Sequence, residues 1–448
     1  MHWLNKSGLV TGIKWTIIRW KDRVRYSPIT GRLVLAGALA KLLFVRSNTA
    51  RANLLIQAYR RAEKPRQRDA ILQKAQSYLG EAQGVVWRDK KINWSRYPQV
   101  TANPLINRSI VLKAPRHNSE KGVMLVMFEY NWLRLLMNRK VADYINQHFD
   151  IILSTSWSPT DYTLLALALN SLQGTIFVQA CNYGEIPWIE QFSPRLKCLP
   201  CIACDWINPE SYKPKPFAER KTDILMVSNW APFKRHWQLF DALRRMPRSL
   251  RVTLIGQKEG RYTLAMLRNQ AALFGVKQDI NFLENISIDE VNRHQCDSKI
   301  SLIMSRREGC CVAAVESLFA NSPLGMMRNA HVGPTTYIND QTGMLLASDH
   351  LDLQLQKFIE QAEGYQPRTW AMENISCFKS AAKLNALFRQ YAQQNGRPWT
   401  ADLKIPHWRP YPIFFHPTDR EEMRPVYEDL HHCFPEVFGA ELLEKGST

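Results

Sequence analysis

The stretch Ser305-Arg-Arg-Glu308-Gly309-Cys-Cys-Val-Ala-Ala-Val-Glu316 decides how the C-terminal half of this chain is expected to fold. Its two glutamates are separated by a little over two helical turns, so a helix that begins near Gly309 carries Glu316 on the face that Glu308 precedes. The start of such a helix offers free backbone N–H groups and the positive end of the helix dipole to a phosphate. The pattern predicts an anion-binding helix start between two carboxylates. By spacing alone, it is more often found as two surface glutamates on an ordinary buried helix.

Strand and helix patterns alternate on both sides of this stretch, from about residue 222 to residue 350. Apolar runs predict strands at 223–228, 251–256, 280–284 and 297–304. Helical patterns cover Trp237–Met246 and begin again at Ile288. This alternation indicates an α/β fold with a parallel, doubly wound sheet.

Polar residues and glycine follow these predicted strands, at positions Asn229, Lys234, Gly256, Glu284 and Glu308. Ligands of doubly wound sheets bind at the carboxyl ends of the strands. We therefore expect these five residues to lie at one edge of the sheet and to form a binding site.

The segment from Thr222 to Leu346 resembles the C-terminal domain of GT-B glycosyltransferases, in particular the family-4 group with the E-x7-E motif, which acts in bacterial glycan biosynthesis. The resemblance rests on Val227-Ser-Asn-Trp-Ala-Pro-Phe-Lys234-Arg235-His236, the strand end Ile255-Gly256, the turn Phe282-Leu-Glu284-Asn-Ile-Ser, the pair Glu308 and Glu316, and the closing segment Gly333–Leu346. It implies two Rossmann-like domains that face each other across a cleft.

The resemblance also implies roles for individual residues. Lys234 and Arg235 would neutralise the donor diphosphate, and Glu308 would hold the hydroxyls of the donor sugar, so Lys234 and Glu308 are the catalytic candidates. Asn229 stands near the start of the loop, where many relatives have arginine.

The other donor-site roles concern backbone and ribose contacts. The main chain at Gly309, Cys310 and Cys311 would meet phosphate or sugar, and Glu316 would accept hydrogen bonds from the ribose. The turn that contains Glu284 and Ile286 would contact the base through its main chain.

The expected activity is sugar transfer from a UDP- or GDP-linked donor to a glycan or a lipid-linked glycan, as in surface polysaccharide biosynthesis. The resemblance implies a retaining mechanism without a metal or cofactor, and no convincing Asp-x-Asp metal motif is present. Two alternatives stay open: a nucleotide-sugar epimerase of the same fold, and a non-catalytic scaffold.

Three further strand patterns, at 122–128, 150–155 and 175–179, predict a Rossmann-like domain in the N-terminal half. Glu129, Asp161 and Glu185 follow these strands, and they are the candidates for acceptor contacts. Exposed loop carboxylates explain the same pattern equally well.

These patterns divide the chain into four expected parts. Residues 1–70 form a basic helical extension, 71–215 the acceptor domain, and 219–365 the donor domain. Residues 366–448 form a crossover helix followed by an aromatic, proline-rich tail.

The charge of the chain is concentrated at its start. The formal net charge is +19, and residues 1–70 hold fifteen Lys and Arg against three Asp and Glu, a net +12. Residues 1–46 mix cations with Trp and Leu, which suits a helix on an anionic membrane surface or one packed on the enzyme's own body. No apolar run is long enough to span a bilayer.

A cytoplasmic protein, peripheral at the inner face of the cytoplasmic membrane, is expected. We expect no nucleic-acid partner, because no such motif is present.

Nine cysteines are scattered along the chain and do not indicate a disulfide framework. Cys198, Cys201 and Cys204 have the spacing of metal ligands, but no fourth ligand follows at a convincing distance, and small buried cysteines are common near strands. The prediction is that no metal is bound.

Overall fold

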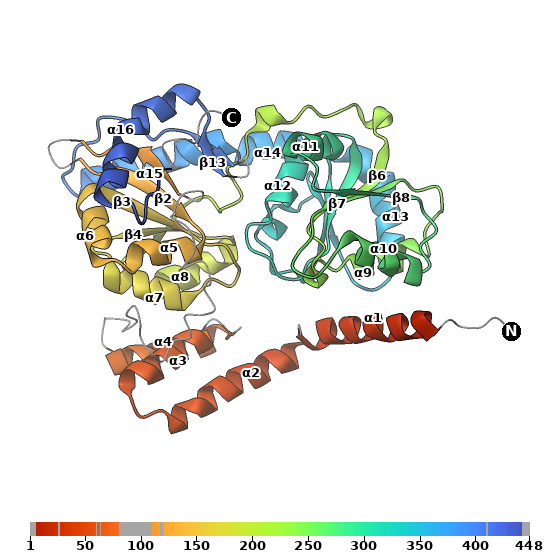
Figure 1. Cartoon of the computed structure of the whole chain (residues 1–448), viewed down its shortest axis with the longest axis horizontal. Helices are drawn as coiled ribbons and strands as arrows, with labels where there is room; N and C mark the ends of the chain where they lie inside the picture. The colour runs from red at the N-terminus through yellow and green to blue at the C-terminus, as the bar shows by residue number, and fades with distance from the viewer. Residues whose placement is uncertain are drawn as a thin grey trace. The chain divides into compact units, whose positions relative to one another are not determined.

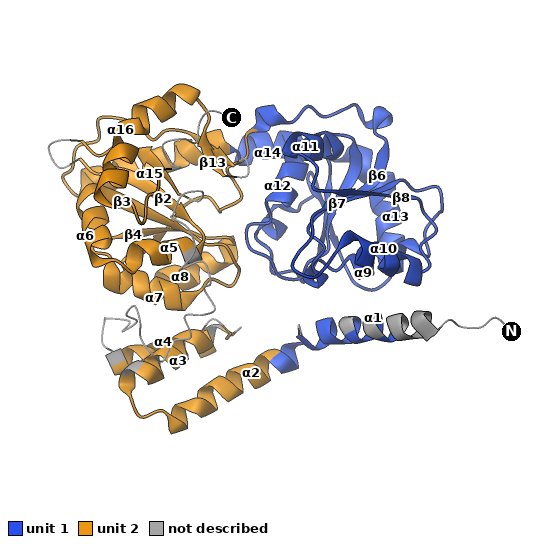
Figure 2. Cartoon of the chain, viewed as in Figure 1, with its two compact units in different colours: residues 1–30, 209–376 blue, residues 31–208, 377–448 orange. Residues whose placement is uncertain are grey.

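The computed structural model describes residues 6–25, 27–59, 61–62, 64–79, 109–116, 120–408 and 411–440. The chain forms two compact units, shown in Figure 2. Unit 1 consists of Met1–Thr30 and Pro209–Ser376, and unit 2 of Gly31–Asn208 and Cys377–Thr448. The chain thus passes between the units after Thr30, Asn208 and Ser376.

Unit 1 is built on a six-stranded sheet in the order β11-β10-β9-β6-β7-β8, in which every pairing is parallel. Its strands are β6 (Thr222–Val227), β7 (Val252–Gly256), β8 (Ile280–Glu284), β9 (Ser298–Ile303), β10 (Leu324–Met327) and β11 (Gly343–Leu346). The central strands β6 and β9 are buried along almost their whole length because helices cover both faces of the sheet.

Two groups of helices cover this sheet, as Figure 1 shows. The first group is α9 (His236–Leu243), α10 (Leu264–Leu273) and α13 (Leu351–Gln361), and the second is α11 (Ile288–Cys296), α12 (Val312–Phe319) and α14 (Pro367–Asn374). The N-terminal helix α1 (Lys6–Arg25) lies against α10. The main apolar core of unit 1 lies between the sheet and the first group, around Leu239, Phe240, Leu267 and Phe358.

Unit 2 contains a five-stranded sheet in the order β1-β2-β3-β4-β5, with β1 antiparallel and the other pairings parallel. The strands are β1 (Ser109–Lys113), β2 (Gly122–Met127), β3 (Phe149–Ser154), β4 (Ile176–Gln179) and β5 (Leu196–Cys198). The helices are α3 (Asn48–Tyr59), α4 (Pro65–Leu79), α5 (Glu129–Leu136), α6 (Arg139–His148), α7 (Tyr162–Ser171), α8 (Ile186–Phe192), α15 (Cys377–Gln394) and α16 (Pro417–Cys433). A small antiparallel pair, β12 (Pro406–Trp408) and β13 (Pro412–Phe414), belongs to the C-terminal segment.

The C-terminal segment returns to unit 2 and closes its core. Phe388 of α15 packs on Phe177 of β4, with ring centroids 4.4 Å apart. Arg397 forms an ion pair with Asp150 at 2.9 Å, and Lys113 forms a buried one with Glu120 at 2.7 Å. The aromatic tail is therefore part of the packed body of unit 2 as far as it is described.

The N-terminal region is helical, as expected, and its parts differ in burial. Helix α3 packs into unit 2, where the Tyr59 ring lies 4.6 Å from that of Tyr162. Helix α2 (Pro28–Ala40), which begins in unit 1 and continues in unit 2, and the 3-10 turn η1 (Lys41–Phe44) expose apolar side chains. In the described part of the chain no single helix is long and apolar enough to cross a membrane, although Arg19–Arg25 and Pro28–Phe44, bent by 56°, meet the length and composition test as a pair.

Gly256 ends β7 where no side chain fits. A Cβ atom at this position would lie 2.1 Å from the Ser228 carbonyl oxygen and 2.7 Å from the Trp230 ring. We expect Gly256→Ala to lower the free energy of unfolding by about 2 kcal/mol, because the backbone has to shift to make room. Urea unfolding measures this change. Gly364→Ala is the control, since a Cβ there meets nothing within 4 Å. Equal stability of the two variants would contradict the prediction.

Candidate functional site

The carboxyl edge of the unit 1 sheet brings together the loops that follow β6 and β9. Lys234 from the first loop and Glu308 from the second form an ion pair, with Nζ 2.7 Å from Oε2. Their side chains are only 14% and 8% exposed, and the Ser305 hydroxyl donates a hydrogen bond to the other Glu308 oxygen. The two catalytic candidates are therefore in direct contact.

The backbone after Glu308 turns sharply before it enters α12. Cys311 has φ 44 and ψ 57, a left-handed conformation, and the helix begins at Val312. Gly309 and Cys310 lie between Glu308 and this turn. Burial, with the Glu308 carboxylate nearby, holds the pKa of the Cys311 thiol well above its usual value.

Glu316 lies on α12 and faces α11. The Gln295 amide donates to Glu316 Oε2 at 3.3 Å. Burial raises the pKa of Glu316, and this hydrogen bond opposes the rise. The carboxylate is therefore held beside a helix rather than in open solvent.

The turn after β8 joins the same edge. The Trp230 indole donates to Glu284 Oε1 at 2.5 Å, and Asn285 N donates to the Gly256 carbonyl at 3.0 Å. Ile286 follows in the turn, and Ser287 caps α11 through a capping box with Glu290. The loops after β6, β7 and β8 are thus tied to one another.

Asn229 and His236 stabilise the loop after β6 from its two ends. Asn229 donates to Glu259 at 3.0 Å and accepts from Ala231 N at 3.3 Å. His236 lies 3.1 Å from the Ser228 hydroxyl, and burial, reinforced by the Lys234 charge, lowers its pKa to about 3. The imidazole is therefore neutral at ordinary pH.

Arg235 turns away from Glu308 toward the N-terminal helix. Its Nε atom lies 3.2 Å from Asp22 Oδ2, and its guanidinium also donates to the Met304 carbonyl at 3.3 Å. The predicted contact of Arg235 with a diphosphate stays a prediction, since the side chain bonds to Asp22 and to the Met304 carbonyl.

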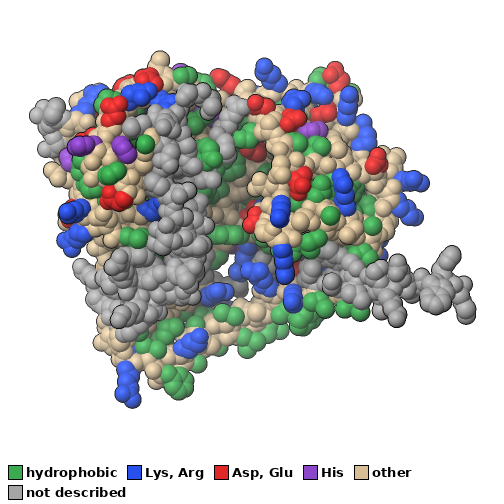
Figure 3. All heavy atoms as spheres, in the orientation of Figure 1, with side chains coloured by type: hydrophobic (Ala, Val, Ile, Leu, Met, Phe, Trp, Pro, Cys, Tyr) green, Lys and Arg blue, Asp and Glu red, His purple; other side chains and the backbone are tan. Residues whose placement is uncertain are grey.

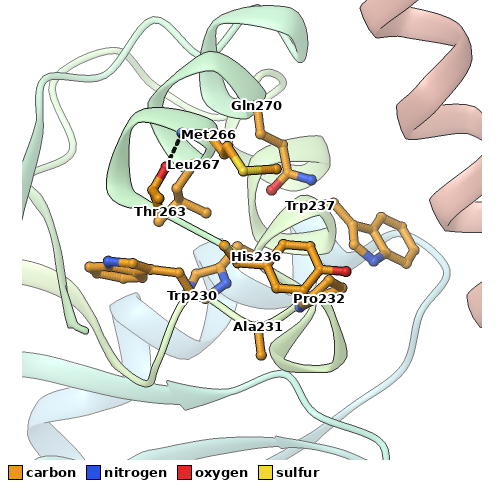
Figure 4. A pocket seen from close by; sticks show the side chains of 10 residues that line it. Trp230, Ala231, Pro232, His236, Trp237, Thr263, Met266, Leu267 and Gln270 are labelled. Atoms are coloured by element: carbon orange, nitrogen blue, oxygen red, sulfur yellow. Dashed lines mark hydrogen bonds between the residues drawn. The ribbon is translucent and has the colours of Figure 1, made fainter. Parts of the chain in front are cut away.

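A small cavity lies behind this loop, lined by Trp230, Ala231, Pro232, His236, Trp237, Tyr262, Thr263, Met266, Leu267 and Gln270 (Figure 4). Its volume is about 20 Å³, enough for a single water molecule. A nucleotide sugar needs a site of several hundred Å³. The cavity therefore belongs to the packing between the loop and α10.

The three acceptor candidates in unit 2 differ in how far their oxygens are used. Glu185 accepts from Ser158 at 2.6 Å and from Thr160 N at 2.7 Å, and Asp161 caps α7 by accepting from Thr163 N at 3.0 Å. Both carboxylates therefore stabilise the backbone of unit 2 through these hydrogen bonds.

Glu129 is the exception. It is buried at the start of α5, and its Oε2 atom accepts from Ser156 N at 2.9 Å, while Oε1 is buried and has no hydrogen-bond partner among the described residues. Burial raises its pKa to about 7 against the opposing hydrogen bonds from Ser156. Perturbed carboxyls of this kind are enriched at functional sites.

Within the described ranges, no group of three or more His, Cys, Asp or Glu side chains is arranged to hold a metal ion. Cys201 and Cys204 are buried, and the Gln179 amide donates to the Cys201 thiol at 3.3 Å.

Sequence reasoning missed two residues of this site. The sequence pattern predicts no role for Ser305, which is only the first residue of the motif. It also predicts none for Asp22, although Asp22 is the sole acidic residue among the first 62 positions. An isolated carboxylate in a strongly basic segment was the available signal for a specific partner.

The Lys234–Glu308 ion pair therefore lies where doubly wound α/β domains bind their ligands, at the carboxyl ends of the strands. Residues 208–366 match the family model of glycosyl transferases group 1. This segment is therefore a glycosyltransferase domain built on a parallel α/β sheet. The match covers one domain rather than the whole chain.

Several solved structures are similar to the chain. HepE from Anabaena in complex with UDP is 14% identical, with a TM-score of 0.48 over 59% of this chain and 78% of that one. Sucrose-phosphate synthase from Thermosynechococcus elongatus is 14% identical, with a TM-score of 0.46 over 61% and 74%. The pneumococcal O-GlcNAc transferase GtfA, in complex with UDP and GlcNAc, is 16% identical, with a TM-score of 0.42 over 60% and 56%. A comparison with curated protein sequences finds no match.

The raised pKa of Glu129 makes stability depend on pH. Between its ordinary value of 4.5 and about 7, the folded protein binds a proton that the unfolded chain lacks, so the free energy of unfolding falls as the pH rises through this window. We expect Glu129→Gln to remove this fall and to be more stable than wild type above about pH 7, by at most about 3 kcal/mol. Urea unfolding at about pH 5 and about pH 8 measures the difference. Glu428→Gln, at an exposed position of α16, is the control. The same pH slope in wild type and Glu129→Gln would rule out this titration.

Proposed function

We propose that the protein transfers a sugar from a nucleotide-sugar donor to a glycan or lipid-linked glycan acceptor. The observation that carries this proposal is the pair Lys234 and Glu308 at the carboxyl edge of a glycosyltransferase domain. In the reaction, the bond between the anomeric carbon and the nucleoside diphosphate breaks, and negative charge builds on the leaving phosphate. A cation beside that phosphate stabilises the transition state.

In this proposal, Lys234 binds the leaving diphosphate and Glu308 binds the sugar. Glu308 accepts hydrogen bonds from sugar hydroxyls through Oε2, the oxygen that pairs with Lys234. Ser305 donates to Oε1 and keeps the carboxylate in place. Glu308 and Glu316 then act as the two glutamates of an E-x7-E pair, with Glu316 on the ribose. Retention of configuration and independence from metal follow from the resemblance to family-4 enzymes.

We place the acceptor on unit 2, and Glu129 is its first contact candidate. Its buried Oε1 atom, which accepts no hydrogen bond from the described residues, supports this choice. Asp161 and Glu185 instead accept hydrogen bonds from backbone N–H groups of unit 2. A carboxyl with a pKa near 7 can accept a proton from an attacking hydroxyl at neutral pH.

We propose that the protein works at the inner face of the cytoplasmic membrane, on acceptors of surface polysaccharide biosynthesis. The exposed apolar side chains of α2 and η1 support this, and Figure 3 shows hydrophobic and basic side chains together on the N-terminal helices. Leu43 and Phe44 are 82% and 85% exposed, beside the exposed Lys41 and Arg46. Apolar residues flanked by cations suit an anionic lipid surface.

The donor assignment is tested by Lys234→Ala and Glu308→Gln. We expect kcat/KM for sugar transfer to fall at least about 100-fold in each, because each removes a charged group from the transition state. Transfer from labelled UDP- and GDP-sugars to a membrane extract measures this. Lys258→Ala, an exposed lysine in the loop after β7, is the matched control and should retain activity. Full activity in the first two variants would refute the assignment.

The membrane assignment is tested by the double variant Leu43→Ser with Phe44→Ser. Burial of each side chain in lipid contributes about 1.5 to 3 kcal/mol, so binding to vesicles that contain phosphatidylglycerol should fall more than about tenfold. Sedimentation with the vesicles measures the bound fraction. The control is Leu353→Ser with Met372→Ser, which alters two exposed apolar residues of unit 1. Equal loss in both double variants, or in neither, would contradict membrane docking through η1.

A further inference from the structure

The helix α1 presents a stripe of exposed apolar side chains on one face. Ile13, Ile17, Trp20 and Val24 follow one another at helical spacing, and all four are exposed, Trp20 by 62%. Residues spaced by three and four positions share one side of a helix. Lys21 and Arg23, both exposed, flank this stripe. The stripe therefore combines apolar and cationic groups as an interfacial helix does.

The opposite face of α1 contacts the donor loop. At 3.6 residues per turn, Asp22 falls on the side away from the apolar stripe. It is buried, and its carboxylate lies 3.2 Å from Arg235 Nε. Arg19 places its guanidinium 5.5 Å from the centre of the Trp237 ring, and Figure 4 shows the N-terminal helix passing beside this tryptophan.

Arg235 connects this contact to both donor-site residues. It directly follows Lys234, and it donates to the carbonyl of Met304, which directly precedes Ser305. Ser305 in turn donates to Glu308. The Arg235 side chain is 2% exposed, so its charge depends on Asp22 for compensation. A displacement of α1 would therefore disturb the loops on both sides of the Lys234–Glu308 pair.

We propose that α1 couples docking on an anionic lipid surface to the donor site, with the Asp22–Arg235 ion pair as the link. The inference rests on the proposed donor site and adds its regulation. Lipid binds the apolar stripe and holds α1 in place, and Asp22 then keeps Arg235, and with it the Lys234 loop, in the arrangement that binds nucleotide. Asp22 acts as a positioning residue, because it reaches the donor only through Arg235.

Charge complementarity argues for lipid as the occupant of the stripe. The cations beside the stripe favour an anionic surface, and juxtamembrane cations each contribute measurably to binding at such a surface. Thermodynamic linkage makes the coupling reciprocal: if lipid raises the affinity for nucleotide by some factor, nucleotide raises the affinity for lipid by the same factor. The coupling can therefore be measured from either side.

The test measures UDP affinity by calorimetry, without vesicles, with vesicles of phosphatidylcholine alone, and with vesicles that also contain phosphatidylglycerol. In the wild-type protein, we expect the anionic vesicles to raise UDP affinity at least about fivefold. Asp22→Asn should bind UDP about tenfold more weakly than wild type and lose the response to vesicles, while its apolar stripe still binds them. Asp22→Glu, which retains the charge, should recover part of the response.

Two further variants separate coupling from simple loss of structure. Trp20→Ser leaves the ion pair intact and alters an exposed residue, so it should keep the UDP affinity of the vesicle-free wild type and lose the vesicle response. Asp352→Asn breaks another Asp–Arg pair of unit 1, with Arg245 at 3.1 Å, and should behave as wild type in both measurements.

Each remaining outcome overturns the inference in a distinguishable way. Vesicle binding that leaves wild-type UDP affinity unchanged would disprove the coupling, and an unaltered response in Asp22→Asn would disprove the role of the ion pair. UDP binding without vesicle binding would mean that the stripe has another occupant, such as a protein. If the wild type binds none of UDP, GDP and ADP, the proposed donor site itself fails, and the inference fails with it.

Discussion

The parallel pairing of β6 with β9 is the constraint on which the site depends. The two strands lie next to each other at the centre of the sheet, with Ile224 opposite Ile300 and Leu225 opposite Ser301. Because they run in the same direction, the loops that follow them leave the sheet at the same edge. That geometry joins Lys234 to Glu308, although they are 74 positions apart in the chain. An antiparallel arrangement would place the two groups at opposite edges.

The Lys234–Glu308 pair also explains how the site can contain two charged groups and still be largely buried. Each group compensates the other in a poorly solvated position, and removal of one alone would leave an unpaired, largely buried charge. In the proposed reaction, a diphosphate would offer Lys234 a new anionic partner, and sugar hydroxyls would then donate to Glu308. Ser305 holds the other carboxylate oxygen throughout, so the exchange needs little rearrangement of the backbone.

The strands of this domain could be predicted closely from the sequence. The expected range 280–284 is that of β8, the range 251–256 differs from β7 by one residue at its start, and the range 223–228 is shifted from β6 by one residue. Such apolar runs are local signals, because a strand covered on both faces must be apolar along its length. The expected helix start near Gly309 is displaced to Val312, since Cys311 adopts a left-handed turn that no spacing rule reveals.

Contacts between distant segments cannot be predicted from local sequence patterns. The resemblance to family-4 enzymes predicts a diphosphate contact for Arg235, but the residue 213 positions earlier that accepts its hydrogen bond is determined by how α1 packs. In the same way, the strand patterns marked Glu129, Asp161 and Glu185 alike. Only the hydrogen bonds of the folded chain distinguish the carboxylate with a free oxygen from the two that serve the backbone.

Arg235 shows why the contact with α1 is more than incidental packing. Its backbone is left-handed, with φ 59, which costs a residue with a side chain about 1 kcal/mol or more and costs glycine almost nothing. A turn that needed only this shape would be better served by glycine. The arginine side chain must therefore offset the strain through its bonds to Asp22 and the Met304 carbonyl. Asp22 is also the sole acidic residue among the first 62 positions, so strain, charge and burial all point to the same contact between α1 and the donor loop.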